Sequence, residues 1–285
     1  MALVNMKAML QQAKAQKYAV GAFEFWSLDS AFAVAEAAQE LSMPVILQVG
    51  HYERDYMYGY PNAYKLATIT AQSFSIPIAL HLDHAESYEE VERVLDAGFT
   101  SVMIDGSMLP MEENIALVQK VVRLASGYNA TVEAELGQLI GIEGKIDSLQ
   151  EHLTDPLQAK EFVNRTNIDA LAVAIGTAHG FYTSTPKIDI KRLKEIALQV
   201  SIPLVLHGGS GTPDKKVAEA IAGGIAKVNI CTEFIAAYGA QLAKAQQETG
   251  FSYNVFKLFK SAQLAAKELV KEKIKLFSAL AGKAG

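Results

Sequence analysis

The chain has little cysteine and no excess of basic charge. Cys231 is the only cysteine among 285 residues, so no disulfide can form within the chain. Lys and Arg together number 26, against 31 Asp and Glu, which gives a formal net charge of −5. Nucleic-acid-binding proteins usually carry a basic face, so this charge argues against nucleic acid as a partner.

Long apolar runs are also absent. No stretch approaches the roughly 18 apolar residues that a membrane-spanning helix needs. The N-terminal segment MALVNMKAMLQQAKAQK has the pattern of an amphipathic helix and lacks the apolar core of a signal peptide. We therefore expect a cytoplasmic protein without a membrane partner. No low-complexity linker divides the chain, so residues 1–285 are expected to form one domain.

Eight short apolar runs alternate with amphipathic stretches. In chain order the runs are YAVGAFEF, PVILQV, PIALHLD, SVMID, ATVEAEL, ALAVAIG, PLVLHG and AKVNI. Such nearly continuous apolar character is typical of parallel strands covered on both faces. Stretches such as LDSAFAVAEAAQEL between them predict helices. Eight such units in about 230 residues predict an α/β fold, the (β/α)8 TIM barrel, with a doubly wound open sheet as the alternative.

Two segments exceed a minimal barrel. A helical pattern over roughly residues 253–280 follows the eighth unit, so we expect an extra C-terminal helical tail that could pack on a partner subunit. The longest irregular segment, GQLIGIEGKIDSLQEHLTDP, follows the fifth predicted strand. Loops of this length are often functional lids.

Polar residues gather at the ends of the predicted strands. They are Glu24, Asp83, His84, Asp105, Glu135, His179, His207 and Asn229. Barrel enzymes build their active sites at this end of the strands. Three imidazoles there would suit Zn²⁺, because three protein ligands leave a position open for water or substrate. The alternative is three separate histidines with local partners. We interpret His81, which shares a strand face with Asp83, as structural support.

A glycine-rich segment, LHGGSGTPDK, follows the seventh predicted strand. Small residues allow backbone N–H groups to approach an anion, and the next helix adds its positive N-terminus. The segment NICTEF after the eighth strand offers Asn229, Thr232 and another helix start. Paired loops after strands seven and eight often bind phosphate in barrels. A turn without a ligand is the alternative.

Six of these motifs together resemble a known family. HLDH, SVMIDGS, VEAELGQ, AIGTAHG, LVLHGGSG and KVNICTE resemble the class II, metal-dependent fructose-bisphosphate and tagatose-bisphosphate aldolases. The similarity extends in order over nearly the whole chain. It implies a lyase of carbohydrate metabolism that cleaves a ketose phosphate reversibly into dihydroxyacetone phosphate and an aldehyde.

The resemblance implies roles for the residues at the strand ends. His84, His179 and His207 would be the zinc ligands. Asp105 and Glu135 would serve as alternative or second-site ligands and as orienting groups. Asp83 resembles the acid/base that exchanges a proton with the C4 hydroxyl, and Glu143 lies where the family's mobile loop carries the Glu that handles the C3 proton. Co²⁺ or another divalent ion could replace Zn²⁺.

These roles fit the chemistry of aldol cleavage. The reaction leaves negative charge on an enediolate, which a divalent metal can stabilise. A base must accept the hydroxyl proton, and a carboxylate beside a dication can stay ionised at neutral pH. A Glu on a closing lid could then deliver a proton while excluding water.

The resemblance also implies how the dihydroxyacetone-phosphate half is held. The matching positions are Gly180, Gly208, Gly209, Ser210, Asn229, Ile230, Cys231 and Thr232. Members of the family often bind a monovalent cation near this phosphate, and they are commonly homodimers or homotetramers.

Three positions depart from the family pattern. Glu24 stands where the family usually has Asn, and Gly50 where it has a small hydroxyl residue. Phe256 aligns with an Arg that, in close relatives, reaches a neighbouring site and binds the aldehyde-half phosphate. All three concern the half that becomes the aldehyde. We therefore expect an altered aldehyde half, with a ketose 1-phosphate as one possibility and an ordinary ketose bisphosphate as the alternative.

Two other classes of function are open at this stage. A metal-dependent hydrolase usually has an H-x-H pair on the first strand, and GAFEFWS has none. A non-catalytic partner subunit that kept the barrel would have less reason to keep Asp83 and the histidines.

Overall fold

The computed structural model describes residues 1–137, 153–180, 182, 185–249 and 254–279. Its strands are β1 (Val20–Glu24), β2 (Val45–Val49), β3 (Ile78–Ala85), β4 (Ser101–Ile104), β5 (Thr131–Leu136), β6 (Ala170–Val173), β7 (Leu204–Leu206) and β8 (Ile225–Ile230). Each strand pairs in parallel with the next, and β8 pairs with β1 to close the barrel. The predicted TIM barrel is confirmed, and the open-sheet alternative is wrong.

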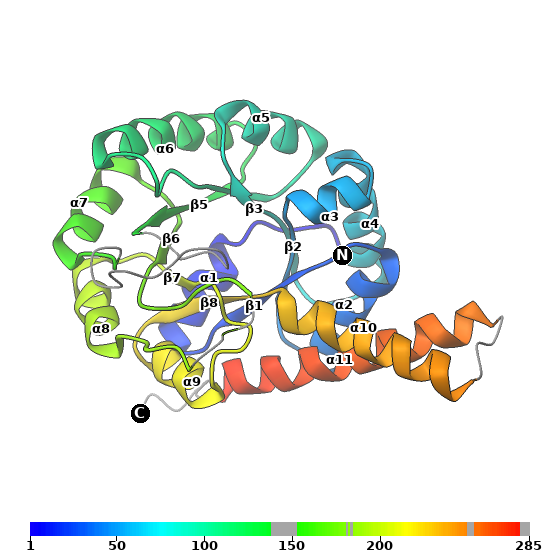
Figure 1. The fold of residues 1–285 in the computed structure, drawn as a ribbon. Helices are drawn as coiled ribbons and strands as arrows, with labels where there is room; N and C mark the ends of the chain where they lie inside the picture. The colour runs from blue at the N-terminus through cyan, green and yellow to red at the C-terminus, as the bar shows by residue number, and fades with distance from the viewer. Residues whose placement is uncertain (138–152, 181, 183–184, 250–253, 280–285) are drawn as a thin grey trace.

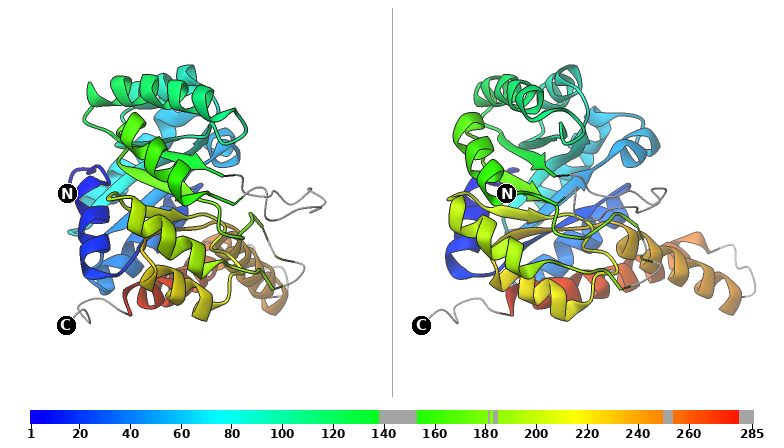
Figure 2. Two further views of the ribbon diagram at one scale, coloured as in Figure 1. Left: turned by 90° about the vertical axis from the view of Figure 1, so that its left-hand side faces the viewer. Right: turned by 60° about the vertical axis from the view of Figure 1, so that its left-hand side comes forward.

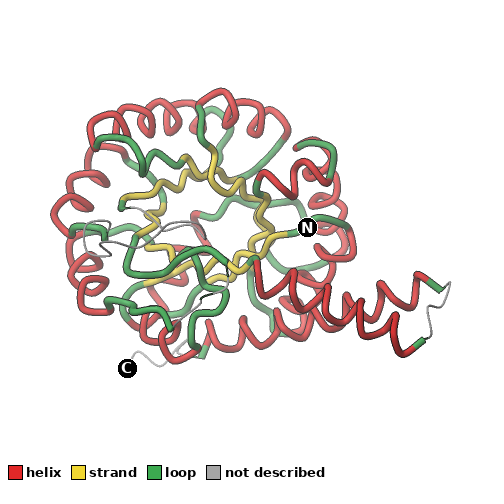
Figure 3. Tube along the Cα trace, in the orientation of Figure 1, coloured by secondary structure: helices red, strands yellow, loops and turns green. Residues whose placement is uncertain are grey.

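Helices surround the strands in a ring, as Figures 1 and 3 show. They are α1 (Lys7–Gln16), α2 (Leu28–Glu40), α3 (His51–Tyr56), α4 (Tyr60–Ser73), α5 (Tyr88–Ala97), α6 (Met111–Ser126), α7 (Pro156–Thr166), α8 (Ile190–Gln199), α9 (Asp214–Ala222), α10 (Thr232–Glu248) and α11 (Val255–Ser278). All but one of the strand residues are buried, which explains why the apolar runs there are nearly continuous.

Polar residues set where several helices begin. Ser27 caps α2 by accepting a hydrogen bond from the Ser30 amide, and Ser87 caps α5 in the same way through Glu90. Asp155 caps α7, whose first residue is proline. Such caps satisfy amides that the first turn of a helix leaves without partners. They fix where each helix starts after its strand loop.

The N-terminal helix closes one end of the barrel. Met6, Met9, Leu10 and Ala13 are buried against residues at the start of the strands, including Val20. Figure 2 shows α1 across the end where the strands begin. The predicted amphipathic helix therefore serves as a plug, which leaves the opposite end of the strands for a site.

Two helices follow β8, so the predicted extra helix is present. The last helix, α11, packs against α2, α9 and β1, and it takes the position in the ring between α9 and α2 (Figure 1). Its partner α10 packs on α11, and together they form a hairpin that extends beyond the barrel. Phe256 near the outer end of this hairpin is 84% exposed. No helix among the described residues is long and apolar enough to cross a membrane.

Candidate active site

Strand β3 directs His81, Asp83 and His84 to the same side of the sheet, because its C-terminal end is irregular. Simple alternation would place Asp83 and His84 on opposite faces of the strand. The pairing of β3 with β4 shifts register between Leu82 and Ala85, and His84 has a φ of 51°. This left-handed backbone is uncommon outside glycine. It turns the His84 ring back to the side where Asp83 lies.

The structure brings the three predicted imidazoles together. The ring centre of His84 lies 5.0 Å from that of His179 and 4.7 Å from that of His207, and the last two are 6.0 Å apart. One nitrogen of each ring lies within 4.8 Å of the others. The alternative of three separate histidines is therefore wrong. The set has the chemistry of a Zn²⁺ site.

The contacts around these rings fit a cation between them. His84 Nδ1 lies 2.8 Å from Asp105 Oδ2, and His84 Nε2 lies 3.0 Å from His207 Nδ1. If His84 Nδ1 donates to Asp105 and His207 Nε2 donates to Glu133, two neutral rings direct lone pairs at each other across this gap, and a positive charge between them would remove the repulsion. Burial alone would lower the pKa of His84, but Asp83, Asp105 and Glu135 outweigh it and raise the pKa to about 10. A proton or a divalent ion would meet the same demand.

The other two imidazoles are predominantly neutral, as metal ligands must be. Burial and the neighbouring rings lower the pKa of His179 to about 4. Burial also lowers the pKa of His207, against the opposing effect of its carboxylate neighbours. A second group of possible ligand atoms joins His84 with Asp105 and Glu135. Both predicted carboxylates thus lie beside the imidazoles.

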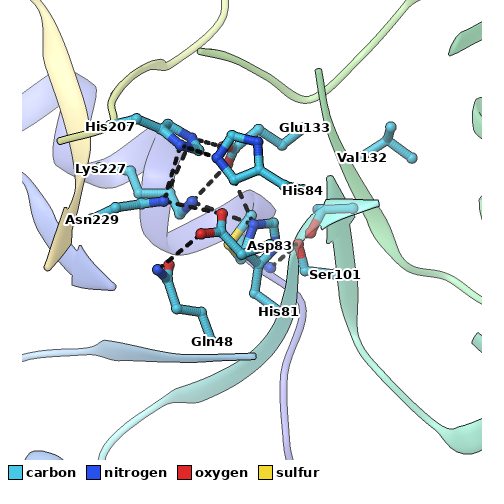
Figure 4. Close-up of polar contacts among 12 residues, drawn as sticks. Gln48, His81, Asp83, His84, Ser101, Val132, Glu133, His207, Lys227 and Asn229 are labelled. Carbon is cyan, nitrogen blue, oxygen red and sulfur yellow. Dashed lines mark hydrogen bonds and ion pairs between the residues drawn. The ribbon is translucent and has the colours of Figure 1, made fainter. Parts of the chain in front are cut away.

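Asp83 is held by two amide groups beside the imidazoles. Its Oδ1 accepts a hydrogen bond from Asn229 Nδ2 at 3.1 Å, and its Oδ2 accepts one from Gln48 Nε2 at 3.3 Å (Figure 4). Burial would raise its pKa, but His84, His207 and Lys227 outweigh burial and lower it to about 2. The carboxylate is ionised and can act as a base.

A polar network that the sequence analysis missed lies below these groups. Lys227 Nζ lies 2.9 Å from Glu133 Oε2, and Glu133 Oε1 lies 2.8 Å from His207 Nε2. Burial alone would raise the pKa of Glu133, but Lys227 and the hydrogen bond from His207 hold it well below its usual range. Glu133 precedes Glu135 by two residues, and Lys227 precedes Asn229 by two. This alternation along each strand is a signal that could have identified both as inward-facing.

The contacts of His81 agree with a structural role for this residue. Its Nδ1 lies 2.8 Å from Ser101 Oγ, and burial with the adjacent Lys227 lowers its pKa to about 3. The ring is fully buried, which agrees with the structural interpretation.

The loops after β6, β7 and β8 approach each other closely. Gly208 has a φ of 66°, and a Cβ there would lie 2.3 Å from the Ala178 carbonyl oxygen. A Cβ at Gly209 would lie 2.7 Å from the Asn229 carbonyl oxygen. The Tyr182 hydroxyl accepts a hydrogen bond from the Ala178 amide and donates one to the Gly208 carbonyl. Only glycine permits this approach, which leaves a compact cradle of backbone groups.

Other residues predicted for phosphate binding lie around this cradle. Ser210 Oγ accepts hydrogen bonds from the amides of Cys231 and Glu233 at the start of α10, so its own proton is free to donate. Thr232 is the first residue of α10. Gly180 also has a positive φ, 89°. The Ile230 side chain is fully buried, so only its backbone could reach a ligand.

The comparisons with known proteins agree with this geometry. The family model described as "Fructose-bisphosphate aldolase class-II" matches residues 4–283. The chain belongs to this family. The predicted class of enzyme, a class II aldolase and hence a lyase of carbohydrate metabolism, is confirmed.

Individual relatives of this class II aldolase span nearly its whole length. The fructose-bisphosphate aldolase of Staphylococcus aureus strain N315 is 42% identical over 279 residues, covering 97% of this chain and 98% of that protein. The crystal structure of the YdjI aldolase from Escherichia coli K12 is 35% identical with a TM-score of 0.86, covering 99% of this chain and all of that chain. The fructose-bisphosphate aldolase structure from Campylobacter jejuni, 21% identical with a TM-score of 0.83 over 97% of this chain and 96% of that one, shows the shared fold alone.

Two of the departures from the class II aldolase pattern meet at the mouth of the barrel. Glu24 at the end of β1 is 4% exposed, and its Oε1 accepts a hydrogen bond from Gln48 Nε2 at 3.0 Å. The Gly50 amide lies 3.2 Å from both Glu24 Oε2 and Glu53 Oε2. Burial, Glu53 and Asp83 raise the pKa of Glu24 well above its ordinary value.

The buried Glu53 was not predicted, because its place in the short α3 gives no sequence signal of burial. Burial raises the pKa of the neighbouring Cys231 thiol, and Glu24, Glu53 and Asp83 raise it further. The carboxyl groups of Glu24 and Glu53 are therefore harder to ionise than free ones, and Cys231 is a neutral thiol.

Two predicted residues are not brought to the site. Phe256 lies in the first turn of α11 at the outer end of the hairpin, so within one chain it does not reach the barrel mouth. Glu143 lies outside the described residues.

Proposed function

We propose that this aldolase cleaves a ketose 1-phosphate reversibly into dihydroxyacetone phosphate and an aldehyde whose far end carries neutral hydroxyls. The observation that carries the proposal is the buried Glu24, beside Glu53 and Asp83 at the barrel mouth. The relatives named for fructose bisphosphate support an ordinary ketose-bisphosphate aldolase more directly, and that is the competing function.

His84, His179 and His207 would hold Zn²⁺, with Co²⁺ or another divalent ion as a substitute. Asp105 would orient His84 through its 2.8 Å contact with Nδ1, and Glu135 would be an additional or alternative ligand. The bound ion would stabilise the negative charge that develops on the substrate oxygen during cleavage.

Asp83 is the proposed base for the C4 hydroxyl. The amides of Asn229 and Gln48 hold both carboxylate oxygens, so the group cannot turn away from the imidazoles. General bases of this kind contribute roughly 10²–10⁴-fold to rate. Proton exchange at C3 is assigned to Glu143 from the family resemblance.

The loops after β6, β7 and β8 would bind the phosphate of the dihydroxyacetone half. The Gly208–Gly209 segment lets the backbones of the neighbouring loops approach closely, the Ser210 hydroxyl can still donate its proton, and α10 directs its positive N-terminus there. Gly180, Thr232 and the backbone of Ile230 and Cys231 complete the cradle. A monovalent cation near this phosphate is part of the proposal.

The aldehyde half would lie toward Glu24 and Gly50. Among the described residues, no Lys or Arg is paired with Glu24 or Glu53, whose contacts are with the amides of Gln48 and Gly50 and with each other. A phosphate dianion here would have no basic partner, and it would further disfavour ionisation of these carboxyl groups in a poorly solvated place. Neutral hydroxyls could instead donate hydrogen bonds to them.

A substrate screen tests the function. We expect release of dihydroxyacetone phosphate from fructose 1-phosphate or tagatose 1-phosphate with a kcat/KM at least about tenfold above that for the 1,6-bisphosphates. EDTA should abolish the activity, and added Zn²⁺ should restore it. A preference for either bisphosphate rejects the altered aldehyde half and leaves the ordinary aldolase. No product from any of the four sugars rejects both.

The assembly proposed is a homodimer or homotetramer. Val255, Phe256 and Phe259 expose apolar surface at the start of α11, where a hairpin extends from the barrel. We propose that a second copy covers this surface. Light scattering should give a mass of two or four chains, and Phe256→Ser should lower it.

A further inference from the structure

A fully buried ion pair lies beneath the imidazoles, on the inner face of the barrel. Lys227 Nζ is 2.9 Å from Glu133 Oε2, and neither side chain is exposed. Within the described part of the chain, Glu133 is the carboxylate that pairs with Lys227. Replacing such pairs by apolar residues is often neutral or stabilising, so stability alone is a weak reason for this one.

The second oxygen of Glu133 contacts a proposed metal ligand. Glu133 Oε1 lies 2.8 Å from His207 Nε2. A carboxylate paired with an ammonium group is ionised and only accepts, so His207 Nε2 carries the proton and donates it. The lone pair of His207 is then on Nδ1, and this atom faces His84 Nε2 at 3.0 Å, where the imidazoles converge.

Lys227 is itself fixed from the other side, as Figure 4 shows. Its Nζ lies 3.4 Å from His81 Nε2, and His81 Nδ1 lies 2.8 Å from Ser101 Oγ. An ammonium group can only donate, so His81 accepts at Nε2 and donates from Nδ1 to Ser101. The hydrogen-bond directions are therefore determined on both sides of Lys227, and neither ring is free to flip.

We propose that Glu133 and Lys227 form a positioning unit for the metal centre. Glu133 fixes the tautomer and the orientation of His207 so that Nδ1 is the metal donor, and Lys227 fixes Glu133. The inference goes beyond the aldol reaction, and it rests on the metal centre proposed above. Removing a carboxylate behind a metal-binding histidine typically weakens metal binding 10- to 100-fold.

The first test uses the unmodified protein with ¹⁵N-labelled histidine. Two-bond nitrogen–proton NMR correlations report which ring nitrogen is protonated, and the spectrum of His207→Gln identifies the signals of His207. In the Zn²⁺-loaded protein we expect a proton on His207 Nε2 and metal on Nδ1. Metal on Nε2 would overturn the proposal.

The second test compares metal affinity among variants. Glu133→Gln keeps the shape of the side chain and removes its charge. We expect its Kd for Zn²⁺, measured by competition with a chelator, to rise 10- to 100-fold, with a shift of the visible absorption bands of the Co²⁺ form. Glu112→Gln is the matched control, because it makes the same change at an exposed carboxylate that pairs with Arg165, and its Kd should stay within threefold. Unchanged affinity in folded Glu133→Gln rejects the proposal.

A double variant covers the case in which Glu133→Gln does not fold because Lys227 is left unpaired. Glu133→Gln with Lys227→Met removes both charges, and the same loss of Zn²⁺ affinity is expected. If the double variant binds Zn²⁺ as tightly as the unmodified protein, the positioning role of Glu133 and Lys227 is rejected, while the proposed metal centre stands. If the unmodified protein binds no Zn²⁺, the proposed metal centre itself fails.

Discussion

Buried carboxylates occur at the floor and at the mouth of the same barrel, and they differ in what balances their charge. At the floor, Glu133 has the Lys227 ammonium group 2.9 Å away. At the mouth, Glu24 shares the Gly50 amide with Glu53, and no basic side chain is paired with either in the described part of the chain. The negative charge of Glu133 at the floor is balanced within the protein by Lys227. The carboxyl groups of Glu24 and Glu53 at the mouth have no such counter-ion, so a proton or a ligand must neutralise them.

The largest expected effect separates catalysis from folding at the mouth. Asp83→Asn should lower kcat about 10²–10⁴-fold, because the amide cannot accept the hydroxyl proton. Zn²⁺ content should change little, because the three imidazoles remain. The variant should stay folded with a lower thermal midpoint, because Asn229 and Gln48 both donate to Asp83 and an amide oxygen can replace only one of its two carboxylate oxygens. Steady-state kinetics, metal analysis and calorimetry check the three points. If the variant loses Zn²⁺ together with its activity, Asp83 supports the metal centre, as Glu133 and Lys227 are proposed to do, and its role as a base is not established.

The next largest effect is expected for the stability that the buried pair of Lys227 and Glu133 at the floor contributes. Lys227→Met should lower the free energy of unfolding by about 3–5 kcal/mol, because it leaves Glu133 buried without its counter-ion. Urea denaturation measures this loss. Lys7→Met is the control: Lys7 pairs with Asp169 at 3.1 Å, but its side chain is 59% exposed. Exposed pairs contribute at most about 1 kcal/mol, so similar losses in the two variants would contradict the comparison.

Substrate preference tests whether Glu24 at the barrel mouth selects the aldehyde half of the substrate. Glu24→Asn restores the residue usual in the family and removes the buried carboxyl group. We expect the ratio of kcat/KM for the 1,6-bisphosphate to that for the 1-phosphate to rise about tenfold or more. Leu198→Ala, at an 85% exposed position on α8, is the control and should leave the ratio unchanged. A ratio that stays constant in Glu24→Asn would show that Glu24 does not select the aldehyde half.

The smallest effect is a pH-dependent gain in stability. Because the folded state raises the pKa of Glu24, the ionised form is unfavourable in the fold at neutral pH. Glu24→Gln should therefore stabilise the protein by about 1–3 kcal/mol at pH 7. The gain should disappear as the pH falls toward about 4.3, where an unfolded glutamate is protonated as well. Urea denaturation at both pH values measures this, and a gain independent of pH would contradict it.

Most of the barrel could be predicted from the sequence, because burial on both faces leaves nearly continuous apolar runs in the eight strands. The position of α11 could not. Its pattern is that of any amphipathic helix, and nothing in it indicates that α11, rather than α10, packs beside α2 and β1. The order of helices along a chain predicts their place in the ring only when no extra helix interrupts it.

The residues of the candidate site could be predicted where polar side chains follow the ends of strands, and less well elsewhere. The three histidines converge as expected, but alternation alone would have directed His84 away from them. The register shift and the left-handed backbone at His84 decide its direction. Glu133 and Lys227 follow the alternation of their strands and could have been found. Glu53 could not, because its burial depends on the fold of α3 over Glu24.

The placement of α11 has a consequence for how the chain is made. The surface of β1 and α2 that leaves the ribosome early is covered by α11, which is synthesised more than 200 residues later and buries Ala262, Ala266 and Phe277. During that interval the nascent chain exposes an apolar stripe with no intramolecular cover. Exposed stripes of this kind are what holdase chaperones bind, so biogenesis of this barrel should depend on them more than that of a barrel whose helices close in order.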